Sequence, residues 1–510
     1  MNEKVIWLFN IVLFVRSQFL DDFQRSLCRE RWKRMDWQQI LRPCKENLEF
    51  GSSKWKDSLR TSPSYSHVLN MDIKKAGEFS KIAIQSRTAE GREKSIGGDV
   101  WRVFISGPSN IAPFVSDLEN GVYEATFLAM EPGFYKAKIY LESTLCEGLK
   151  DPPREVLKRG IKRDGTETQY SKGRVWRPIR GDGASFKVEA NDKMDKREIQ
   201  KRLNRWKDSC GANYKCDLLW NGFGRWVNKT WKPYIEDLKI PGSEEQEIFG
   251  KECIRKTSGK MMMYGDNFAK SFFDSQSTAS LFNNIFENVT MSYNGDLSSR
   301  GDIAAASKDF SIKAELKKLQ EITRRSEMDE RSVLLLNYGL PYLERMPFGA
   351  YKKMMDRVAR TLDGYKGQAV WRTTASFQKQ TPDAVKAFES FQRTKLFNAY
   401  TLAKMCSEGY PAVDISDMTA STPNQPSDAS GFDFSVVKPM EKALKGYFQT
   451  RTSKKCEREK VFKKVKVEAN VDLKSQMDSE SGSGSGGGAY ENEGIKQVNA
   501  SSTYTQQSVH

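Results

Sequence analysis

Histidine is the scarcest chemistry-bearing residue of this 510-residue chain, which contains only His67 and His510. Eight cysteines are present, but no two of them form a Cys-x-x-Cys pair. Structural zinc sites take their ligands from Cys and His at short spacings, so the sequence argues against a zinc site. We predict no metal and no cofactor. The lack of histidine also limits acid–base catalysis, which this side chain carries most often.

Long apolar runs are also lacking: beyond the N-terminus, no stretch approaches the roughly twenty residues that a membrane-spanning helix needs. The N-terminus has one Lys, an apolar run from Val5 to Val15 and then Ser17. This pattern is typical of a signal peptide over residues 1–17, and a retained anchor is the alternative because Arg16 adjoins the cleavage site. We therefore expect a secreted, extracellular protein whose membrane contact is at most peripheral.

Signatures of nucleic-acid binding are absent as well: the sequence has no zinc-finger, helix-turn-helix or RNP pattern. We therefore predict no nucleic-acid partner, although the formal net charge is +16. For a secreted protein, such a charge favours sulfated or sialylated glycans and other anionic surfaces as partners. An ordinary solvated basic surface is the alternative explanation.

The cysteines and three Asn-x-Ser/Thr triplets agree with a secretory route. An even number of cysteines can pair fully in an oxidising compartment, although the sequence does not give the connectivity. The triplets begin at Asn228, Asn288 and Asn499. Triplets of this kind accept N-linked glycans only in the secretory pathway, so we predict glycosylation at Asn228 and Asn288.

Changes in composition divide the chain into six regions. The signal peptide (1–17) precedes a charged N-terminal segment (18–65). Residues 66–145 alternate between apolar and polar side chains in short runs, and residues 146–205 form a basic connector that we interpret as a solvated surface. An α/β domain follows (206–455). The tail (456–510) is Gly/Ser-rich and polar, so we expect it to be disordered.

Period-two alternation in residues 66–145 predicts an antiparallel β-sandwich of about seven strands. Alternating runs lie at 81–85, 101–105, 121–127 and 134–140. The details resemble a filamin-type immunoglobulin-like repeat. The resemblance is carried by Gly97-Gly98-Asp99 before a strand, by the turn at Asn120-Gly121, and by Gly133-Phe-Tyr135 at the start of the last strand.

Strand and helix patterns alternate through the following domain, which predicts a parallel sheet with right-handed crossovers. Expected strands are 261–264, 289–293, 333–337, 369–373 and 412–415, and expected helices are 266–286, 310–325, 351–362, 383–406 and 436–447. Between the first strand and its helix lies the corner Gly265-Asp266-Asn267. A corner of this kind stands at the carboxyl edge of the sheet, where open α/β folds bind ligands. An ordinary βα loop with Asp266 as the helix cap is the alternative.

The segment upstream of this corner resembles the entry segment of PC-esterases and of the plant trichome-birefringence-like family. It begins Cys216-Asp-Leu, continues as Gly224-Arg-Trp-Val and ends at Pro233-Tyr. Leu336-Asn337-Tyr-Gly and Trp371-Arg372-Thr-Thr are similar to later strands of that family. Together with the filamin-like module, these motifs resemble the animal neurexophilin and PC-esterase family. The resemblance implies an SGNH-type three-layer α/β/α fold and the transfer or removal of acyl groups on glycans.

The chain departs from that family at its catalytic positions. The family has Ser at the corner after the first strand, and Asn267 stands there. The family's Asp-x-x-His block falls on Asp428-Ala-Ser-Gly431, so Gly431 replaces the base. Asn337 is a candidate donor to an oxyanion, or simply an Asn at a strand end that bonds a neighbouring loop. Gly265, Asp266, Asn267 and Asn337 remain candidates for a ligand pocket, with no catalytic set intact.

We therefore favour a secreted, non-catalytic member of this family that binds a glycan or an extracellular protein. The alternative from another class is an active glycan O-acetyl esterase or acyltransferase of the SGNH type with an unrecognised arrangement. A purely adhesive protein that acts through its β-sandwich is a third interpretation. The missing histidine is the feature that favours the first of these over the second.

Overall fold

The computed structural model describes most of the chain between Phe23 and Ser453. The described residues are Phe23, 25–159, 169, 173–191, 218–219, 222–234, 254–255, 259–274, 286–293, 311–376, 388–423, 432 and 434–453. All of them belong to one compact unit, Met1–Arg458. The predicted signal peptide (1–17), the predicted tail (456–510) and the predicted degenerate positions Asp428 and Gly431 lie outside the described residues.

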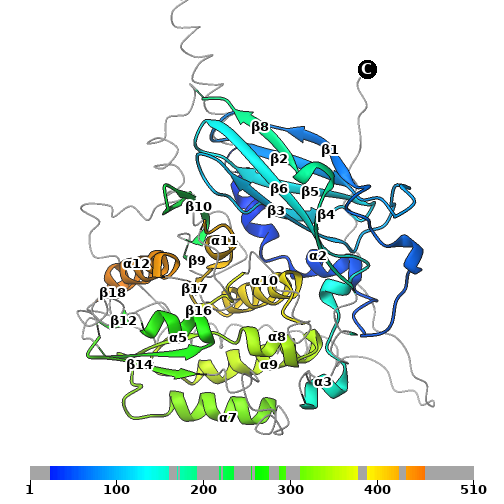
Figure 1. The fold of residues 1–510 in the computed structure, drawn as a ribbon. Coiled ribbons are helices and arrows are strands. Elements are labelled where there is room, and N and C mark those ends of the chain that lie inside the picture. The colour runs from blue at the N-terminus through cyan, green and yellow to red at the C-terminus, as the bar shows by residue number, and fades with distance from the viewer. Residues whose placement is uncertain are drawn as a thin grey trace, which may run out of the picture. The chain divides into compact units, whose positions relative to one another are not determined.

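Two antiparallel sheets form a β-sandwich in the first half of the chain (Figure 1). The first sheet has the order β1-β2-β5-β4, with the bounds β1 His67–Asp72, β2 Phe79–Gln85, β5 Val122–Leu128 and β4 Phe114–Asp117. The second sheet has the order β3-β6-β7, and its fourth strand, β8, pairs with the other end of the long strand β6. The bounds of these strands are β3 Val100–Ser106, β6 Gly133–Ser143, β7 Arg174–Pro178 and β8 Ala184–Val188.

The sandwich core comes from the inward side of each alternating strand. Ile82 and Ile84 on β2, Trp101 and Val103 on β3, and Ile139 on β6 are nearly or completely buried. Because successive side chains of a strand point to opposite faces, the residues between them face outward. The alternation read from the sequence therefore produces this core directly.

Strands β7 and β8 come from the stretch that the sequence analysis assigns to a solvated connector. Both pair with β6 in the antiparallel sense, and Phe186 and Val188 of β8 enter the sandwich core. Alternation is present in Ala184–Val188, but Lys and Arg residues around it obscure the apolar signal. The sandwich therefore extends past residue 145, the boundary expected from the sequence.

Six parallel strands form the central sheet of the α/β domain, in the order β14-β13-β15-β16-β17-β9. Their bounds are β13 Lys260–Gly265, β14 Asn288–Tyr293, β15 Val333–Leu336, β16 Gln368–Arg372, β17 Ala412–Val413 and β9 Leu218–Leu219. Strands β13, β15 and β16 are nearly all buried, as expected of a parallel sheet covered on both faces. The strands β13 to β17 can be numbered 1 to 5 in chain order. Their order across the sheet is then 2-1-3-4-5, which is an order typical of doubly wound folds.

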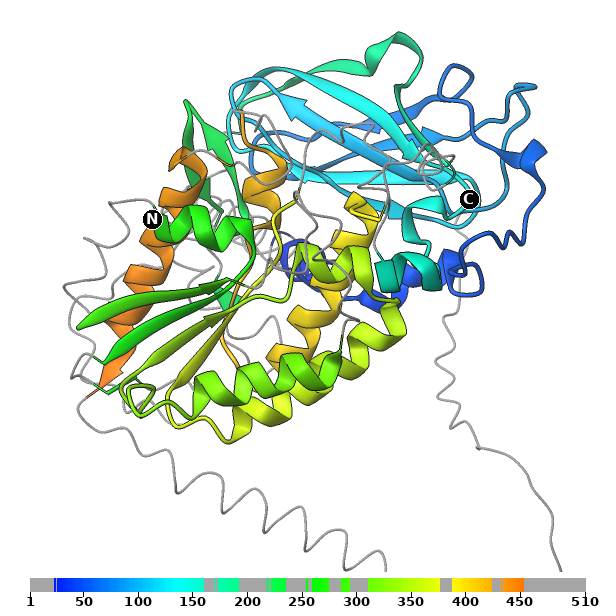
Figure 2. The same cartoon turned by 60° about the horizontal axis from the view of Figure 1, so that its bottom comes forward.

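Helices cover both faces of this sheet (Figure 2). On one face α5 packs against α12, and on the other α9 packs against α7 and α10. Their bounds are α5 Asn267–Asp274, α12 Phe434–Arg451, α7 Ile312–Thr323, α9 Phe348–Asp363 and α10 Phe391–Ser407; the short helices α8 Leu340–Arg345 and α11 Ser416–Ala420 follow β15 and β17. The predicted fold class, an immunoglobulin-like sandwich followed by a three-layer α/β/α domain, is confirmed.

The N-terminal segment and one hairpin join the two domains. Helix α2 (Trp37–Leu41) packs against α10, and Arg34 forms an ion pair with Asp417 of α11, with 2.8 Å between Nη2 and Oδ2. The hairpin of β10 (Gly224–Val227) and β11 (Thr230–Pro233) bridges to the sandwich through backbone bonds between Trp226 and Asn110.

Within the part of the chain that is described, no helix combines the length and the apolar character needed to cross a membrane.

Candidate functional site

The carboxyl ends of β13 and β15 define the candidate site. These two strands are neighbours in the sheet, and Tyr264 pairs with Leu336 at the end of their ladder. The chain leaves β13 toward β14 on one side and leaves β15 toward β16 on the other, so their ends flank the point where the strand order reverses. Ligands of doubly wound sheets bind at such a point. Asp266 and Asn337 follow directly on the two strands.

Asp266 has two structural roles at this edge. Its backbone oxygen accepts from the Lys270 N–H at 3.0 Å, and its Oδ1 accepts from the Ala269 N–H at 3.4 Å, so it caps α5. The same Oδ1 accepts from Arg372 Nη2 at 2.6 Å, and both side chains are 1% exposed. A fully buried carboxylate needs such a partner, because isolating its charge from water would be very costly.

Asn337 is tied to the end of the next strand, β16. Its Nδ2 donates to the Arg372 carbonyl oxygen at 2.9 Å and to Thr374 Oγ1 at 3.3 Å. A side-chain amide has two N–H donors, and these two bonds use both of them. In this arrangement Asn337 is the strand-end Asn that bonds its neighbours, and its amide does not offer a hydrogen to an oxyanion.

Backbone packs closely around these polar groups. A Cβ on Gly339 would stand 2.5 Å from Asn337 Oδ1 and 2.6 Å from both Asp266 Oδ2 and Thr374 Oγ1. A Cβ on Gly265 would stand 2.9 Å from the Cβ of Ala269. Only glycine fits at Gly339 without moving the polar groups, so the residues that the sequence marks as a pocket are covered by the chain itself.

A second set of hydrogen bonds continues along the same edge. The Asn398 side chain bonds both backbone groups of Thr374, with 2.8 Å for each bond. Thr373 Oγ1 donates to Asp414 Oδ1 at 2.8 Å, which links β16 to the residue after β17. The carboxyl ends of the central strands are therefore joined by a continuous polar network.

Asn267, the residue that the sequence resemblance aligns with a nucleophile, is the first residue of α5. The serine nearest in sequence, Ser271, lies inside that helix. Asp428 and Gly431 fall outside the described residues, and His67 begins β1 in the sandwich. Burial raises the pKa of the Tyr338 phenol well above its usual range, and Tyr264 and Glu315 add to this shift. Tyr338 therefore remains protonated and cannot replace a histidine base.

The two predicted glycosylation sites are both exposed. Asn228 lies in the turn between β10 and β11 with a φ of 47°. Asn288 is the first residue of β14, the edge strand of the parallel sheet. Asn288 pairs with Lys260, at the opposite end of the β13–β14 ladder from the corner at Gly265.

From the sequence, Trp371-Arg372-Thr-Thr is predicted only as a strand similar to one of the family, and no role is predicted for Arg372. The signal was present, since an Arg in an otherwise apolar buried strand requires a buried acceptor. A cavity of about 450 Å³ between the sandwich and the end of α11 was also missed. Its walls come from strands and a loop that are distant in the sequence.

No protein-family model matches the chain, and no curated protein matches it. Among solved structures, it is similar to the Lin-41 filamin domain (15% identity, TM-score 0.18, covering 26% of this chain and 99% of the other). It is also similar to a GDSL-like lipase from Bacteroides thetaiotaomicron (12% identity, TM-score 0.29, 37% and 87% covered). A third similar structure is a putative SGNH hydrolase from Slackia heliotrinireducens (15% identity, TM-score 0.23, 38% and 98% covered). All three TM-scores lie below 0.5, so the fold assignment rests on the strand order and pairing of this chain.

Proposed function

We propose that this protein is a secreted binding protein whose α/β domain has the architecture of an SGNH-type esterase without its chemistry. The observation that carries the proposal is the polar network at the carboxyl edge of β13, β15 and β16. There Asp266 is bound to Arg372, and the Asn337 amide is bound to the end of β16. Groups that would bind and activate an ester in an esterase are engaged in holding the strands together.

Ester hydrolysis by this fold needs a nucleophile, a base and oxyanion donors. Asn267 has an amide where a hydroxyl is needed, and an amide cannot form an acyl-enzyme. Gly431 stands at the sequence position of the base, and the histidine among the described residues, His67, begins β1 of the sandwich. In hydrolytic triads, loss of nucleophile and base lowers the rate by about six orders of magnitude. We therefore assign the domain to binding.

The ligand class that we propose is a glycan, and an extracellular protein is the alternative. The resemblance to the neurexophilin and PC-esterase family supports a glycan, since acyl groups on glycans are the substrates that this family implies. The net charge of +16 also favours an anionic glycan among extracellular ligands. Membership of that family is part of this proposal.

The test uses the full chain purified from the medium of animal cells. It is incubated with p-nitrophenyl acetate and with O-acetylated sialic acid, and it is applied in parallel to a glycan array. We expect no saturable hydrolysis and a defined set of bound glycans. Asn267→Ser and Gly431→His should each stay inactive, because a hydroxyl without a base and a base without a hydroxyl do not act alone. Saturable turnover by the natural protein would contradict the proposal and support an active esterase.

A further inference from the structure

The outer face of the second sandwich sheet carries an unusual concentration of aromatic side chains. On β3 the residues Trp101, Val103 and Ile105 enter the core, so Arg102, Phe104 and Ser106 point outward. The antiparallel register places Phe104 opposite Lys138 and Arg102 opposite Tyr140 on β6. Pairs of this kind lie side by side on one face.

A β-bulge brings a third ring onto this face. Leu141 pairs with Arg177, and Ser143 pairs with Arg174, so two residues of β7, Val175 and Trp176, lie opposite the single residue between them on β6. Trp176 has a φ of 42°, a conformation that is strained for a bulky residue. Bulges often redirect a side chain next to a functional site.

The redirected indole completes an aromatic wall. The ring of Trp176 stacks on Tyr140 with 5.3 Å between centroids and 9° between planes, and Phe104 meets Tyr140 edge-on at 6.2 Å. The guanidinium of the buried residue Arg102 lies 5.3 Å from the Trp176 ring and 5.1 Å from the Phe104 ring. Cation–π contacts with Arg102 therefore help to hold the Trp176 and Phe104 rings in place.

This wall lines the 450 Å³ cavity noted above, which we name the aromatic cleft. The cleft is also lined by Ser421, Thr422 and Pro423, which follow α11 in the α/β domain. Small-molecule sites commonly occupy about 300–1,000 Å³ and occur where domains meet. The aromatic cleft satisfies both conditions.

Polar groups in the cleft are available to a ligand. Lys138 and Asn110 line it beside the rings. Asn110 uses its backbone N–H and oxygen to pair with Trp226. Among the described residues, none forms an ion pair with Lys138 or a hydrogen bond with the side chain of Asn110. A purely apolar ligand would bury this ammonium and this amide without compensation.

We propose that the aromatic cleft binds an acidic sugar unit, a pyranose ring that bears a carboxylate or a sulfate. One face of a pyranose presents C–H groups that pack on the accessible side of the aromatic rings lining the cleft, and its edge presents hydroxyls that suit Asn110. The negative substituent pairs with Lys138, in agreement with the basic charge of the chain. This inference rests on the proposed binding function and names its ligand class and its location.

The experiment titrates the full secreted chain with 3′-sialyllactose, with a sulfated heparin disaccharide and with neutral lactose, followed by tryptophan fluorescence and calorimetry. The sialylated and sulfated probes distinguish a carboxylate from a sulfate as the favoured anion. We expect at least one of them to bind about tenfold more tightly than lactose. Trp176→Ala should weaken binding about tenfold or more, and Lys138→Ala should remove the preference for the acidic probe.

Matched controls lie on the same strand, β6. Phe134 is 75% exposed and lies outside the cleft, so Phe134→Ala deletes an aromatic ring and should leave binding unchanged. Lys136→Ala removes an exposed charge two residues from Lys138 and should do the same. Lys138 is itself exposed, so its variant remains informative even if Trp176→Ala fails to fold.

Failure of this inference differs from failure of the proposed function. If no acidic probe binds, or if binding survives both Trp176→Ala and Lys138→Ala, the assignment of the cleft is overturned. A glycan-array signal that persists in those variants would leave the binding function intact and move its site elsewhere. Saturable ester hydrolysis by the natural protein would instead overturn the function.

Discussion

Asp266 and Arg372 illustrate how a single buried ion pair at the carboxyl edge of the sheet can resemble part of an active site. Both side chains are 1% exposed, and the separation between Oδ1 and Nη2 is 2.6 Å. Taking two charges out of water is costly, and close contact offsets that cost only while both partners are present. The pair therefore fixes the geometry of the edge, whether or not a ligand binds there.

Replacing Asp266 by Asn tests this role. The substitution keeps the size of the side chain but leaves the Arg372 guanidinium buried without its carboxylate. We expect the free energy of unfolding to fall by about 3–5 kcal/mol, measured by urea denaturation. Asp329→Asn is the control, because Asp329 pairs with Arg331 at the surface, where 33% and 41% of the side chains are exposed. Its cost should stay below about 1 kcal/mol. If both substitutions lowered the free energy of unfolding by the same amount, the buried pair would contribute no more to stability than the surface pair, and the argument would be wrong.

The substitution Gly339→Ala tests the close packing above the same edge. A Cβ at this position would contact three polar side-chain atoms at 2.5–2.6 Å, well inside van der Waals distance. We expect Gly339→Ala to lower the free energy of unfolding by about 1–3 kcal/mol. Gly349 in α9 is the matched control, since a Cβ there has no neighbour within 4 Å among the described residues. Gly349→Ala should raise stability by about 0.5 kcal/mol, because Ala favours helix over Gly. If Gly339→Ala raised the free energy of unfolding, the space above this edge of the sheet would have room for a side chain, and the packing argument would be wrong.

At the scale of elements, helix α10 connects the parallel sheet to the sandwich. Its first N–H, from Phe391, donates to Glu142 Oε1 of β6 at 3.0 Å. One turn later, Lys395 Nζ donates to the Val115 carbonyl oxygen of β4 at 2.8 Å and lies 3.6 Å from the centre of the Phe114 ring. The pKa of Lys395 is lowered to about 7, chiefly by burial and also by Arg34 and Lys33, while Asp117 and Glu30 oppose the shift.

This lowered pKa has a consequence for stability above neutral pH. Lys395 binds a proton more weakly in the folded than in the unfolded chain, where its pKa is 10.5. Between about pH 7 and pH 10 the unfolded state therefore binds more protons, and the stability contributed by this site rises with pH. The full cost of the buried ammonium applies below pH 7. Burial raises the pKa of Asp117 to about 6, so this carboxyl titrates below that window.

Lys395→Met removes the titrating group and keeps an apolar side chain of similar length. We expect the difference in Tm, natural protein minus variant, to increase by about 2 °C or more between pH 7 and pH 9. Differential scanning fluorimetry at several pH values measures this difference. Lys353→Met on α9 is the control, because the Lys353 side chain is exposed to solvent, and the pH profile of this variant should run parallel to that of the natural protein. A parallel profile for Lys395→Met would contradict the argument.

The sequence predicts most elements whose signal is local. The strands β13, β14, β15 and β16 appear as apolar runs, and their helices appear through capping residues and helical spacing, with Asp266 capping α5 as expected. Strand β9 has two residues, too few for any periodicity, and its partner β17 lies almost two hundred positions away. It could not be predicted, because its existence depends on the sheet already being formed.

The candidate site is predicted only in part for the same reason. Gly265, Asp266 and Asn337 could be placed at one edge, because parallel strands share their carboxyl ends. The bonds of Asp266 and Asn337 to the end of β16 depend on which strands are neighbours, and that information is not local. The aromatic cleft depends on a bulge in β7, a strand that the charged connector conceals.

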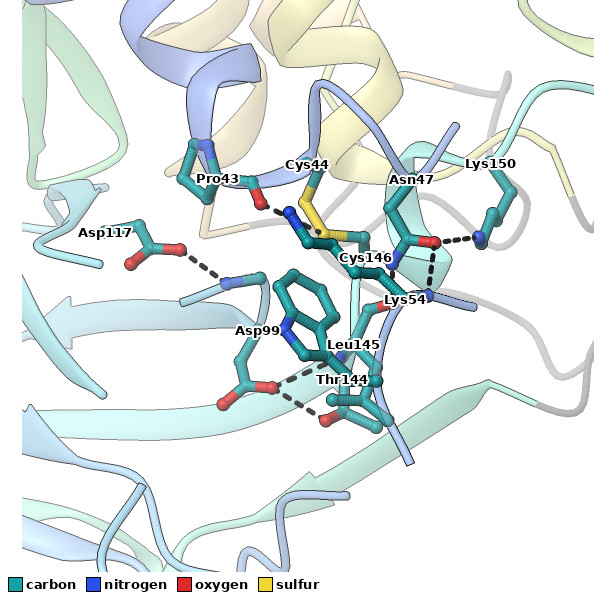
Figure 3. The surroundings of a disulfide bond; sticks show 12 residues. Pro43, Cys44, Asn47, Lys54, Asp99, Asp117, Thr144, Leu145, Cys146 and Lys150 are labelled. Carbon is teal, nitrogen blue, oxygen red and sulfur yellow. Dashed lines mark hydrogen bonds between the residues drawn. A yellow bond between two sulfur atoms is a disulfide. The ribbon is translucent and has the colours of Figure 1, made fainter. Parts of the chain in front are cut away.

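At the scale of the whole molecule, the N-terminal segment links the two domains through contacts that are distant in sequence. Cys44 forms a disulfide with Cys146, and Lys150 Nζ donates to Asn47 Oδ1 at 2.8 Å beside it (Figure 3). Arg34 of the same segment reaches Asp417, 383 positions away. A cross-link of this kind restricts the unfolded chain and favours the folded one. None of these partners could be chosen from the sequence alone.

The disulfide and the exposed triplets lead to the last prediction, which concerns the compartment of the protein. Cytosolic thiols are kept reduced, so the bond between Cys44 and Cys146 agrees with the secretory route that we propose. Expressed in animal cells, the protein should appear in the medium and lose mass when N-linked glycans are removed enzymatically. Asn228→Gln and Asn288→Gln should each remove the mass of one glycan, and the double substitution should remove both, because both side chains are exposed. Thr126→Ala, a buried Thr outside any triplet, is the control and should not change the glycan mass. Retention in the cytosol with thiols that react with maleimide would exclude the secretory route, and a glycan partner would then lose its main support.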